Sequence, residues 1–259
     1  MEVVILSSPE EVAAMGARVV AGLLVRKPDA VLALPTGRTP LPFYAELVRL
    51  HRDRQLSFAR ATTFNLDEYV GLPADHPASF RRYMTEALFD HVDLVPERIH
   101  VPDGRAADVP ASCAAYEAAI AAAGGIDLAV LGLGADGHIA FNEPTSSLGS
   151  RTRLKTISAA TRAANQPAFG DEPVPHHVIT IGIATILAAR RCLLLATGER
   201  KAGALARTVE GPLTALCPSS ALQLHPHVTV LCDEAAASAL ALAEYYRAVH
   251  AAKPVWQRD

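Results

Sequence analysis

The 259-residue sequence is poor in several features that mark particular classes of protein. No strongly apolar run reaches the roughly 18 residues of a membrane-spanning helix, and the acidic start of residues 1–12 predicts a strand rather than a signal peptide. The four cysteines form no Cys-x-x-Cys pair, which favours buried free thiols in a reducing cytoplasm over disulfides or a metal site. A net charge of only −3 indicates no general attraction to nucleic acid or to an anionic membrane.

The sequence also lacks linkers, repeats and long charge runs, and short apolar runs alternate with helical patterns throughout. This alternation predicts an α/β fold, with a mostly parallel sheet covered by helices on both faces, in a single domain over residues 1–259. The expected strands are 3–7, 30–34, 61–65, 126–132, 177–183, 192–197 and 228–232.

Two helices are predicted in more detail. Ser8 followed by Pro9 and two glutamates is typical of a helix start, because serine caps the free N–H groups and proline fits the first helical position. A last helix is expected over about 235–252, with Leu242, Tyr246 and Val249 on its apolar side.

Ligands of such sheets bind beyond the carboxyl ends of the strands, so the polar loops that follow strands carry the most information. The first such loop contains Thr36, Gly37, Arg38 and Thr39, just before a helix expected to begin near Pro40. A glycine, two hydroxyls and a helix N-terminus suit a phosphate. An ordinary capped turn fits the same residues.

The second and third loops carry acid–base groups. Asp67 and Glu68 follow a strand, where one of them can serve as a general base or both can be solvated turn residues. The Gly-rich segment 132–144 places Asp136 and Glu143 near His138, as in an acid–base relay whose carboxylates orient the imidazole. A packed core histidine and a metal site are the alternatives, although the spacing matches no common metal motif.

These loops together resemble the glucosamine-6-phosphate deaminases. The resemblance is carried by LPTGRTP at 34–40, FNLDEYVGL at 64–72, GLGADGHIAFNEP at 132–144 and SSLGSRTRLKT at 146–156, and it continues through GERKA and LQLHP. It implies a Rossmann-like fold of the type shared with 6-phosphogluconolactonases. It also implies conversion of glucosamine 6-phosphate to fructose 6-phosphate and ammonia, with no metal and no organic cofactor.

The resemblance also assigns roles to residues. Asp67 is similar to the family's proton acceptor at C2, and His138 to its ring-opening histidine, with Asp136 and Glu143 as carboxylate partners. The loop of Thr36, Gly37, Arg38 and Thr39, together with Lys201, is expected to bind the phosphate. Lys201 by itself would also fit a surface lysine.

Further positions resemble the site at which allosteric members bind N-acetylglucosamine 6-phosphate, namely Ser146, Ser147, Arg153 and Lys155. Family members without allosteric control carry a similar segment, so regulation stays open. The family includes hexamers and monomers, so a homo-oligomer is one of two expectations.

One departure concerns the phosphate. Where the family usually has a basic phosphate ligand, this sequence has Pro167, and Arg38 stands where a small residue is common. The expectation is a cytoplasmic enzyme, an amino-sugar-phosphate isomerase or hydrolase, whose partner is a small sugar phosphate rather than nucleic acid or membrane. Two alternatives remain: an enzyme for another hexose 6-phosphate or its lactone, and a sugar-phosphate-binding regulatory module.

Overall fold

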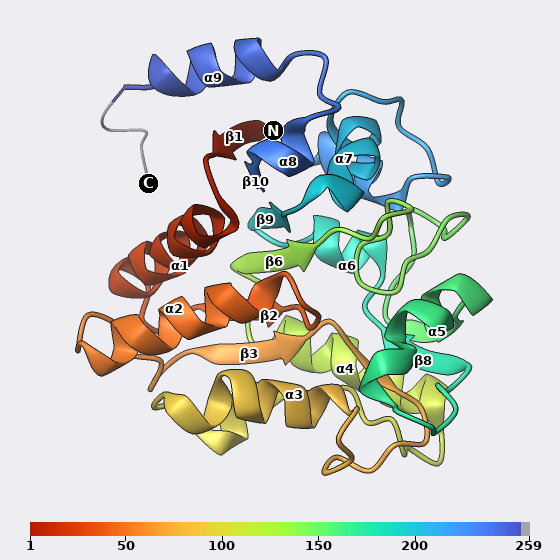
Figure 1. The fold of residues 1–259 in the computed structure, drawn as a ribbon. Helices are drawn as coiled ribbons and strands as arrows, with labels where there is room; N and C mark the ends of the chain where they lie inside the picture. The colour runs from red at the N-terminus through yellow and green to blue at the C-terminus, as the bar shows by residue number, and fades with distance from the viewer. Residues whose placement is uncertain (255–259) are drawn as a thin grey trace.

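The computed structural model describes residues 1–254, and a parallel sheet of seven strands lies at its centre (Figure 1). Every neighbouring pair of strands in this sheet runs parallel. Its central strands are apolar and buried on both faces, as the sequence predicts for a sheet covered by helices. In spatial order the strands are β1 (Glu2–Leu6), β10 (Val228–Asp233), β9 (Arg191–Ala196), β6 (Leu128–Gly132), β2 (Val31–Leu34), β3 (Thr62–Asn65) and β5 (Ile99–His100).

Helices cover both faces of this sheet, which confirms the predicted fold class. One face packs against α1 (Pro9–Arg26), α2 (Pro40–Arg52) and α3 (Phe80–Ala87). The other packs against α4 (Val109–Ala122), α6 (Ile183–Leu187), α7 (Ala202–Val209) and α8 (Glu234–Ala237). The remaining helices are α5 (Ala159–Asn165), α9 (Ala243–Ala251) and the 3₁₀ turns η1 (Phe89–His91), η2 (Pro96–Arg98), η3 (Gln166–Ala168), η4 (Glu199–Lys201) and η5 (Pro218–Leu224).

The predicted start of α1 is confirmed. The Ser8 hydroxyl accepts a hydrogen bond from the Glu11 N–H, and Pro9 is the first helical residue. All four cysteines are free and buried, as expected. Within residues 1–254, no helix is long and apolar enough to cross a membrane.

A second, antiparallel sheet lies beside the main one, and the sequence did not predict it. Its order is β4 (Asp67–Tyr69), β8 (His177–Thr180) and β7 (Arg153–Thr156). The strand expected over 177–183 therefore belongs to this small sheet and ends early. The strand ends at Thr180 because the chain then enters α6, whose N-cap is Gly182. Only glycine fits there, since a Cβ would lie 2.0 Å from the Ser150 carbonyl oxygen.

The expected single helix over 235–252 is wrong. The chain forms α8 and α9 instead, since the Glu210 carboxylate accepts hydrogen bonds from the backbone N–H groups of Ala241 and Leu242, at 2.8 Å each, between the two helices. Leu242 and Val249 are both 51% exposed, so they do not form the buried side that their spacing suggested.

The order of the strands decides where the site lies. From β2 the chain proceeds outward to β3 and β5, and then returns to the other side of β2 to build β6, β9 and β10. The strand order therefore reverses between β2 and β6, and sheets of this type bind ligands beyond the carboxyl ends of the strands at such a point. All three loops singled out in the sequence leave from the carboxyl edge of the sheet.

Candidate active site

The loop after β2 is held by two tyrosines. The Tyr44 hydroxyl donates to the Pro35 carbonyl at 2.5 Å, and the Tyr83 hydroxyl donates to the Gly37 carbonyl at 2.6 Å. Gly37 has a φ of +114°, which a residue with a side chain rarely adopts. Arg38 is exposed on this loop, directly before α2. The structure therefore presents a fixed loop with a free cation at the start of a helix, an arrangement suited to an anion.

Asp67 lies at the junction of the two sheets. Leu66 is the single residue between β3 and β4, and Asp67 is the first residue of β4, so the expected loop residue is in fact a strand residue. Its side chain is buried. Burial, followed by the charge of Glu68, raises the pKa of Asp67 to about 8, against a hydrogen bond with Thr36 that lowers it. A carboxyl group that titrates near neutral pH is suited to take up and return a proton.

Glu68, unlike Asp67, is engaged in hydrogen bonds with the backbone. Its carboxylate accepts hydrogen bonds from the backbone N–H groups of Tyr69 at 2.8 Å, Phe80 at 3.0 Å and Arg81 at 2.9 Å. These bonds fix the first turn of α3. Because Glu68 is occupied by the backbone, Asp67 is the member of the pair that is available for chemistry.

The loop after β6 brings Asp136 and His138 together. The Oδ1 atom of Asp136 lies 2.6 Å from Nδ1 of His138 and also accepts the His138 backbone N–H at 3.1 Å. Burial opposes ionisation of Asp136, but these hydrogen bonds and the charge of His138 outweigh it and lower the pKa of Asp136 to about 2. The imidazole packs closely against Gly134. A Cβ at that position would lie 2.3 Å from the ring, so only glycine allows this approach.

Glu143 is placed differently from the expectation. Its carboxylate accepts hydrogen bonds from Ser158 and Thr161 at the start of α5. Asp136, two residues before His138 in sequence, contacts its imidazole. Glu143, five residues after His138, is bonded to the start of α5 instead. The structure thus shows one carboxylate on the imidazole, and the pairing of Glu143 with His138 stays a prediction.

Lys201 lies in η4, directly after β9, the neighbour of β6. Burial lowers its pKa, while the charge of Asp136 acts in the opposite direction. The effect of the Asp136 charge on this pKa indicates that Lys201 lies near the loop of His138. A half-buried lysine in that position is placed to receive an anion, unlike a lysine on the open surface.

The comparisons with known proteins agree with this geometry. Residues 8–231 match the family of glucosamine-6-phosphate isomerases and 6-phosphogluconolactonases. The chain belongs to this family.

Individual relatives are more specific. A protein of Arthrobacter sp. strain FB24 and one of Mycolicibacterium smegmatis, both named glucosamine-6-phosphate deaminase, are 54% and 52% identical to this chain over 99% of each sequence. A solved structure described as a monomeric glucosamine-6-phosphate deaminase superposes with a TM-score of 0.90 at 45% identity, covering 92% of this chain and 100% of that one. The 6-phosphogluconolactonase of Trypanosoma cruzi, at 23% identity and a TM-score of 0.74, shares the fold.

The family membership supports an isomerase and deaminase class and does not support the broader class of hydrolase expected from the sequence. In the family's phosphate region, Pro167 lies exposed in η3 and supplies no cation. Arg162, on α5, contacts the ring of His176. Arg38 is therefore better placed than Arg162 to take over the missing charge.

The positions that resemble the family's allosteric site form two pairs. Ser146 is buried, and its hydroxyl has no partner within residues 1–254, while the Ser147 hydroxyl accepts the Gly149 N–H at 3.3 Å. Arg153 and Lys155 alternate with exposed residues on β7, so they share one face of that strand, and burial lowers the pKa of Arg153. Allosteric binding at these four positions stays a prediction.

Several residues of the site escaped sequence reasoning. Tyr44 and Tyr83 tether the loop after β2, and Ser158 and Thr161 hold Glu143, yet none of them belongs to the motifs at the strand ends. The one available signal was the pattern Ser-x-x-Thr at 158–161, which is typical of a helix start. Its partner, a carboxylate fifteen residues earlier, becomes visible only in the folded chain.

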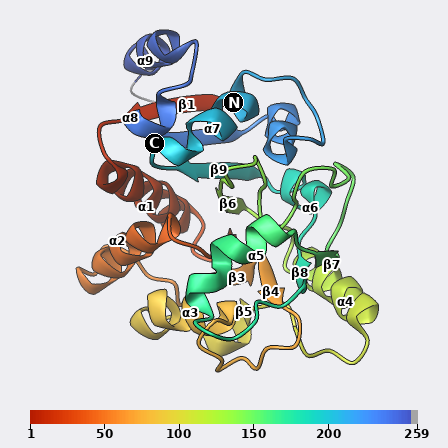
Figure 2. The ribbon, with the colours of Figure 1, turned by 45° about the vertical axis from the view of Figure 1, so that its right-hand side comes forward.

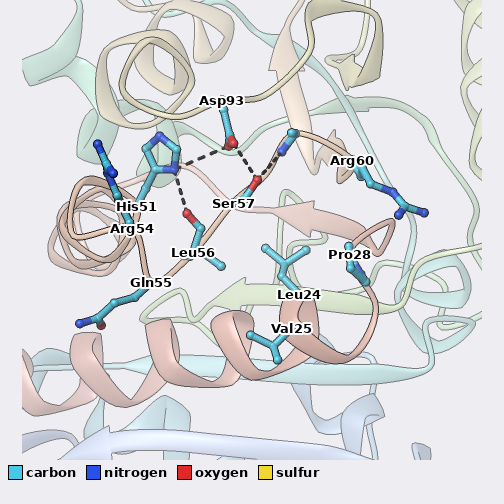
Figure 3. Close-up of a pocket in the computed structure, with 11 residues that line it drawn as sticks. Leu24, Val25, Pro28, His51, Arg54, Gln55, Leu56, Ser57, Arg60 and Asp93 are labelled. Atoms are coloured by element: carbon cyan, nitrogen blue, oxygen red, sulfur yellow. Dashed lines mark hydrogen bonds and ion pairs between the residues drawn. The ribbon is translucent and has the colours of Figure 1, made fainter.

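A separate hollow of about 530 Å³ lies at the opposite, amino edge of the sheet, between the ends of α1 and α2 (Figure 3). It is lined by residues such as Leu24, His51 and Asp93 and contains none of the candidate site residues. Among the described residues, no group of three or more His, Cys, Asp or Glu side chains is arranged to hold a metal ion.

Proposed function

We infer that this chain converts glucosamine 6-phosphate and water to fructose 6-phosphate and ammonia by acid–base catalysis. The observation that carries the inference is the position of two proton-transfer groups on either side of a phosphate loop. Asp67 follows β3 and His138 follows β6, and β2, which leads into the loop, lies between them. Two strand spacings, about 10 Å, separate β3 from β6, which leaves room for a sugar between the segments that follow them.

We propose that His138 opens the sugar ring. Its imidazole takes the proton of the C1 hydroxyl and supplies one to the ring oxygen as the C1–O5 bond breaks. The carboxylate of Asp136, 2.6 Å from Nδ1, orients the ring and stabilises the imidazolium. Nε2 is then the nitrogen that faces the substrate.

Asp67 would carry out the second proton transfer. As a carboxylate it removes the proton from C2 of the open-chain sugar and returns it to C1, while a second proton passes from the amine to O1, which turns the amino-aldose into a C2 imine with a C1 hydroxyl. Water adds to C2 and ammonia leaves, giving the ketose. Burial of Asp67 strengthens its basicity, which is what removal of a carbon-bound proton requires.

The phosphate would lie on Thr36, Gly37, Arg38 and Thr39, with Lys201 opposite. Exposed backbone N–H groups and hydroxyls of this loop solvate the dianion, and the start of α2 adds its favourable dipole. Anchoring the phosphate also orients C1 and C2 toward the two proton-transfer groups, which contributes to the rate as well as to affinity.

The test is an assay that couples ammonia release to fructose 6-phosphate formation, run over a panel of hexosamine 6-phosphates. Glucosamine 6-phosphate is expected to have the highest kcat/KM. Turnover of 6-phosphogluconolactone without release of ammonia from any amino sugar would contradict the proposal and favour the lactonase alternative. Binding of sugar phosphates without turnover of any of them would favour a regulatory module.

A further inference from the structure

Helix α5 connects the two parts of the candidate active site (Figure 2). Its start is bonded to Glu143, in the segment that follows β6. Its last residue, Asn165, donates a hydrogen bond of 2.8 Å to the hydroxyl of Tyr69, which lies in β4 two residues after Asp67. Phe169, just beyond α5, packs edge-on against the same tyrosine ring at 5.1 Å. A single helix therefore links the strand of the proposed base to the segment of the proposed ring-opening group.

The hydrogen bonds at the start of α5 fix the orientation of the Glu143 carboxylate. Oε2 accepts the backbone N–H of Ser158 at 2.9 Å, while Oε1 accepts the Ser158 hydroxyl at 2.7 Å and the hydroxyl of Thr161. Glu143 is only 8% exposed, so water cannot easily replace these donors. Three donors direct both oxygens, and a carboxylate retains a further lone pair for one more partner.

We propose that Ser158 and Thr161 are positioning residues, which set the direction of the Glu143 carboxylate toward its work with His138. The proposal rests on the proposed function and on the role that the family resemblance implies for Glu143, as a carboxylate partner of the ring-opening histidine. A carboxylate that serves an imidazole must be charged and correctly directed when the proton moves. The hydrogen bonds that direct Glu143 come from the start of α5 rather than from the loop that carries Glu143.

The two hydroxyls differ in what else they do. The Ser158 hydroxyl also caps α5, because it accepts the Thr161 N–H at 3.2 Å. Ser158→Ala therefore removes a helix cap together with the bond to Glu143. Thr161→Val replaces a hydroxyl by a methyl group of similar size and leaves the helix cap in place. This variant therefore tests the bond to Glu143 more directly than Ser158→Ala.

The experiment measures kcat and KM of the full-length enzyme carrying Thr161→Val, in the wild-type background and in a Glu143→Gln background. In the wild-type background we expect kcat to fall about tenfold, with KM within threefold, because a hydrogen bond to a charged group is lost. In the Glu143→Gln background the same change is expected to cost no further activity, since the group it serves is already altered. Thr161→Ser, which restores a hydroxyl, is expected to recover most of the rate.

Thr85→Val is the matched control, because the Thr85 hydroxyl bonds only within its own helix, to the Arg81 carbonyl at 2.9 Å. It is expected to leave kcat unchanged.

Three results would overturn the proposal. They are equal losses from Thr161→Val in both backgrounds, a lowered Tm with normal kcat, and a Glu143→Gln enzyme of normal kcat. A wild-type enzyme that releases no ammonia would instead refute the proposed function.

Discussion

Asp127 and Asp67 are buried carboxylates at the two edges of the main sheet, and their surroundings differ in opposite ways. At the amino edge, Asp127 accepts hydrogen bonds from Lys27 at 2.7 Å, from Arg190 at 2.9 Å and from the Val31 N–H at 2.8 Å. At the carboxyl edge, Asp67 is equally buried, yet its Oδ1 atom has no hydrogen-bond partner among residues 1–254, and its pKa is raised to about 8.

A second pair of polar side chains, Asp93 near the amino edge and Asn65 near Asp67, shows the same difference in hydrogen bonding. Asp93, near the amino edge, accepts a hydrogen bond from the Ser57 hydroxyl at 2.7 Å (Figure 3) and another from the Phe58 N–H at 2.6 Å. Near Asp67, the side chain of Asn65 is fully buried, and within the described part of the chain neither of its polar atoms is hydrogen-bonded. Unpaired buried polar groups reduce stability, so we interpret the amino edge as built for stability and the carboxyl edge as built for a substrate.

Replacing the proposed base is expected to have the largest effect. Asp67→Asn keeps the shape and removes the proton acceptor, so kcat should fall by about 10²–10⁴-fold. Steady-state assays of ammonia release measure this loss, and calorimetric titration with an open-chain amino-hexitol phosphate should show nearly unchanged binding. A kcat within threefold of wild type would exclude Asp67 as the base.

The same Asp67→Asn enzyme should be more stable than the wild type, and increasingly so as the pH rises. The folded pKa is raised above the unfolded one, so between about pH 4 and 8 the native state retains a proton that the unfolded state has lost. Raising the pH then favours unfolding of the wild type, and the full cost is present above pH 8. We expect a gain of about 2 kcal/mol at pH 8.5, or roughly 4–8 °C in Tm, and little at pH 4.

At the amino edge the opposite result is expected. Asp127→Asn weakens the pairing with two cations while leaving a side chain of the same size. The unfolding free energy should fall by about 2–3 kcal/mol, because hydrogen bonds to a charged group are lost. Chemical denaturation measures this change, and kcat should stay within twofold of wild type. A large loss of kcat without loss of stability would show that the two edges are not separate in function.

Arg38→Ala tests how the carboxyl edge recognises phosphate. With Pro167 in place of a basic ligand, we expect the KM for glucosamine 6-phosphate to rise about tenfold, since one charged contact to the dianion is lost. Arg52→Ala, at the other end of α2, is the matched control and should change nothing. A KM within twofold of wild type would leave the phosphate to Lys201 and the backbone.

Tyr83→Phe should produce the smallest effect. It removes one neutral hydrogen bond, to the Gly37 carbonyl, and so loosens the loop without removing a direct ligand. We expect KM to rise two- to fivefold, corresponding to about 0.5–1 kcal/mol, with kcat nearly unchanged. If KM stays constant, Tyr44 alone is enough to hold the loop.

The sequence identified the three loops that form the site but not how each residue within them acts. Residue type alone does not separate the adjacent acids Asp67 and Glu68, although the family resemblance favours Asp67. The fold supplies the physical reason, because backbone N–H groups of α3 bind Glu68 and not Asp67. Glu143 and Asp136 both lie near His138 along the chain, yet the N-cap of α5, Ser158, fifteen residues after Glu143, holds the Glu143 side chain.

The sequence by itself determined the features that depend on residues close together in the chain. Apolar runs predicted six of the seven strands of the main sheet, all except the two-residue β5. Ser8 and Pro9 began α1, and the glycines marked loops that approach other groups closely. The tertiary structure decided the small antiparallel sheet, the break between α8 and α9, and the raised pKa of Asp67. Each of these depends on groups far apart in the chain, because a strand needs a pairing partner, a helix yields to a competing hydrogen bond, and a carboxyl group responds to how much water its neighbours exclude.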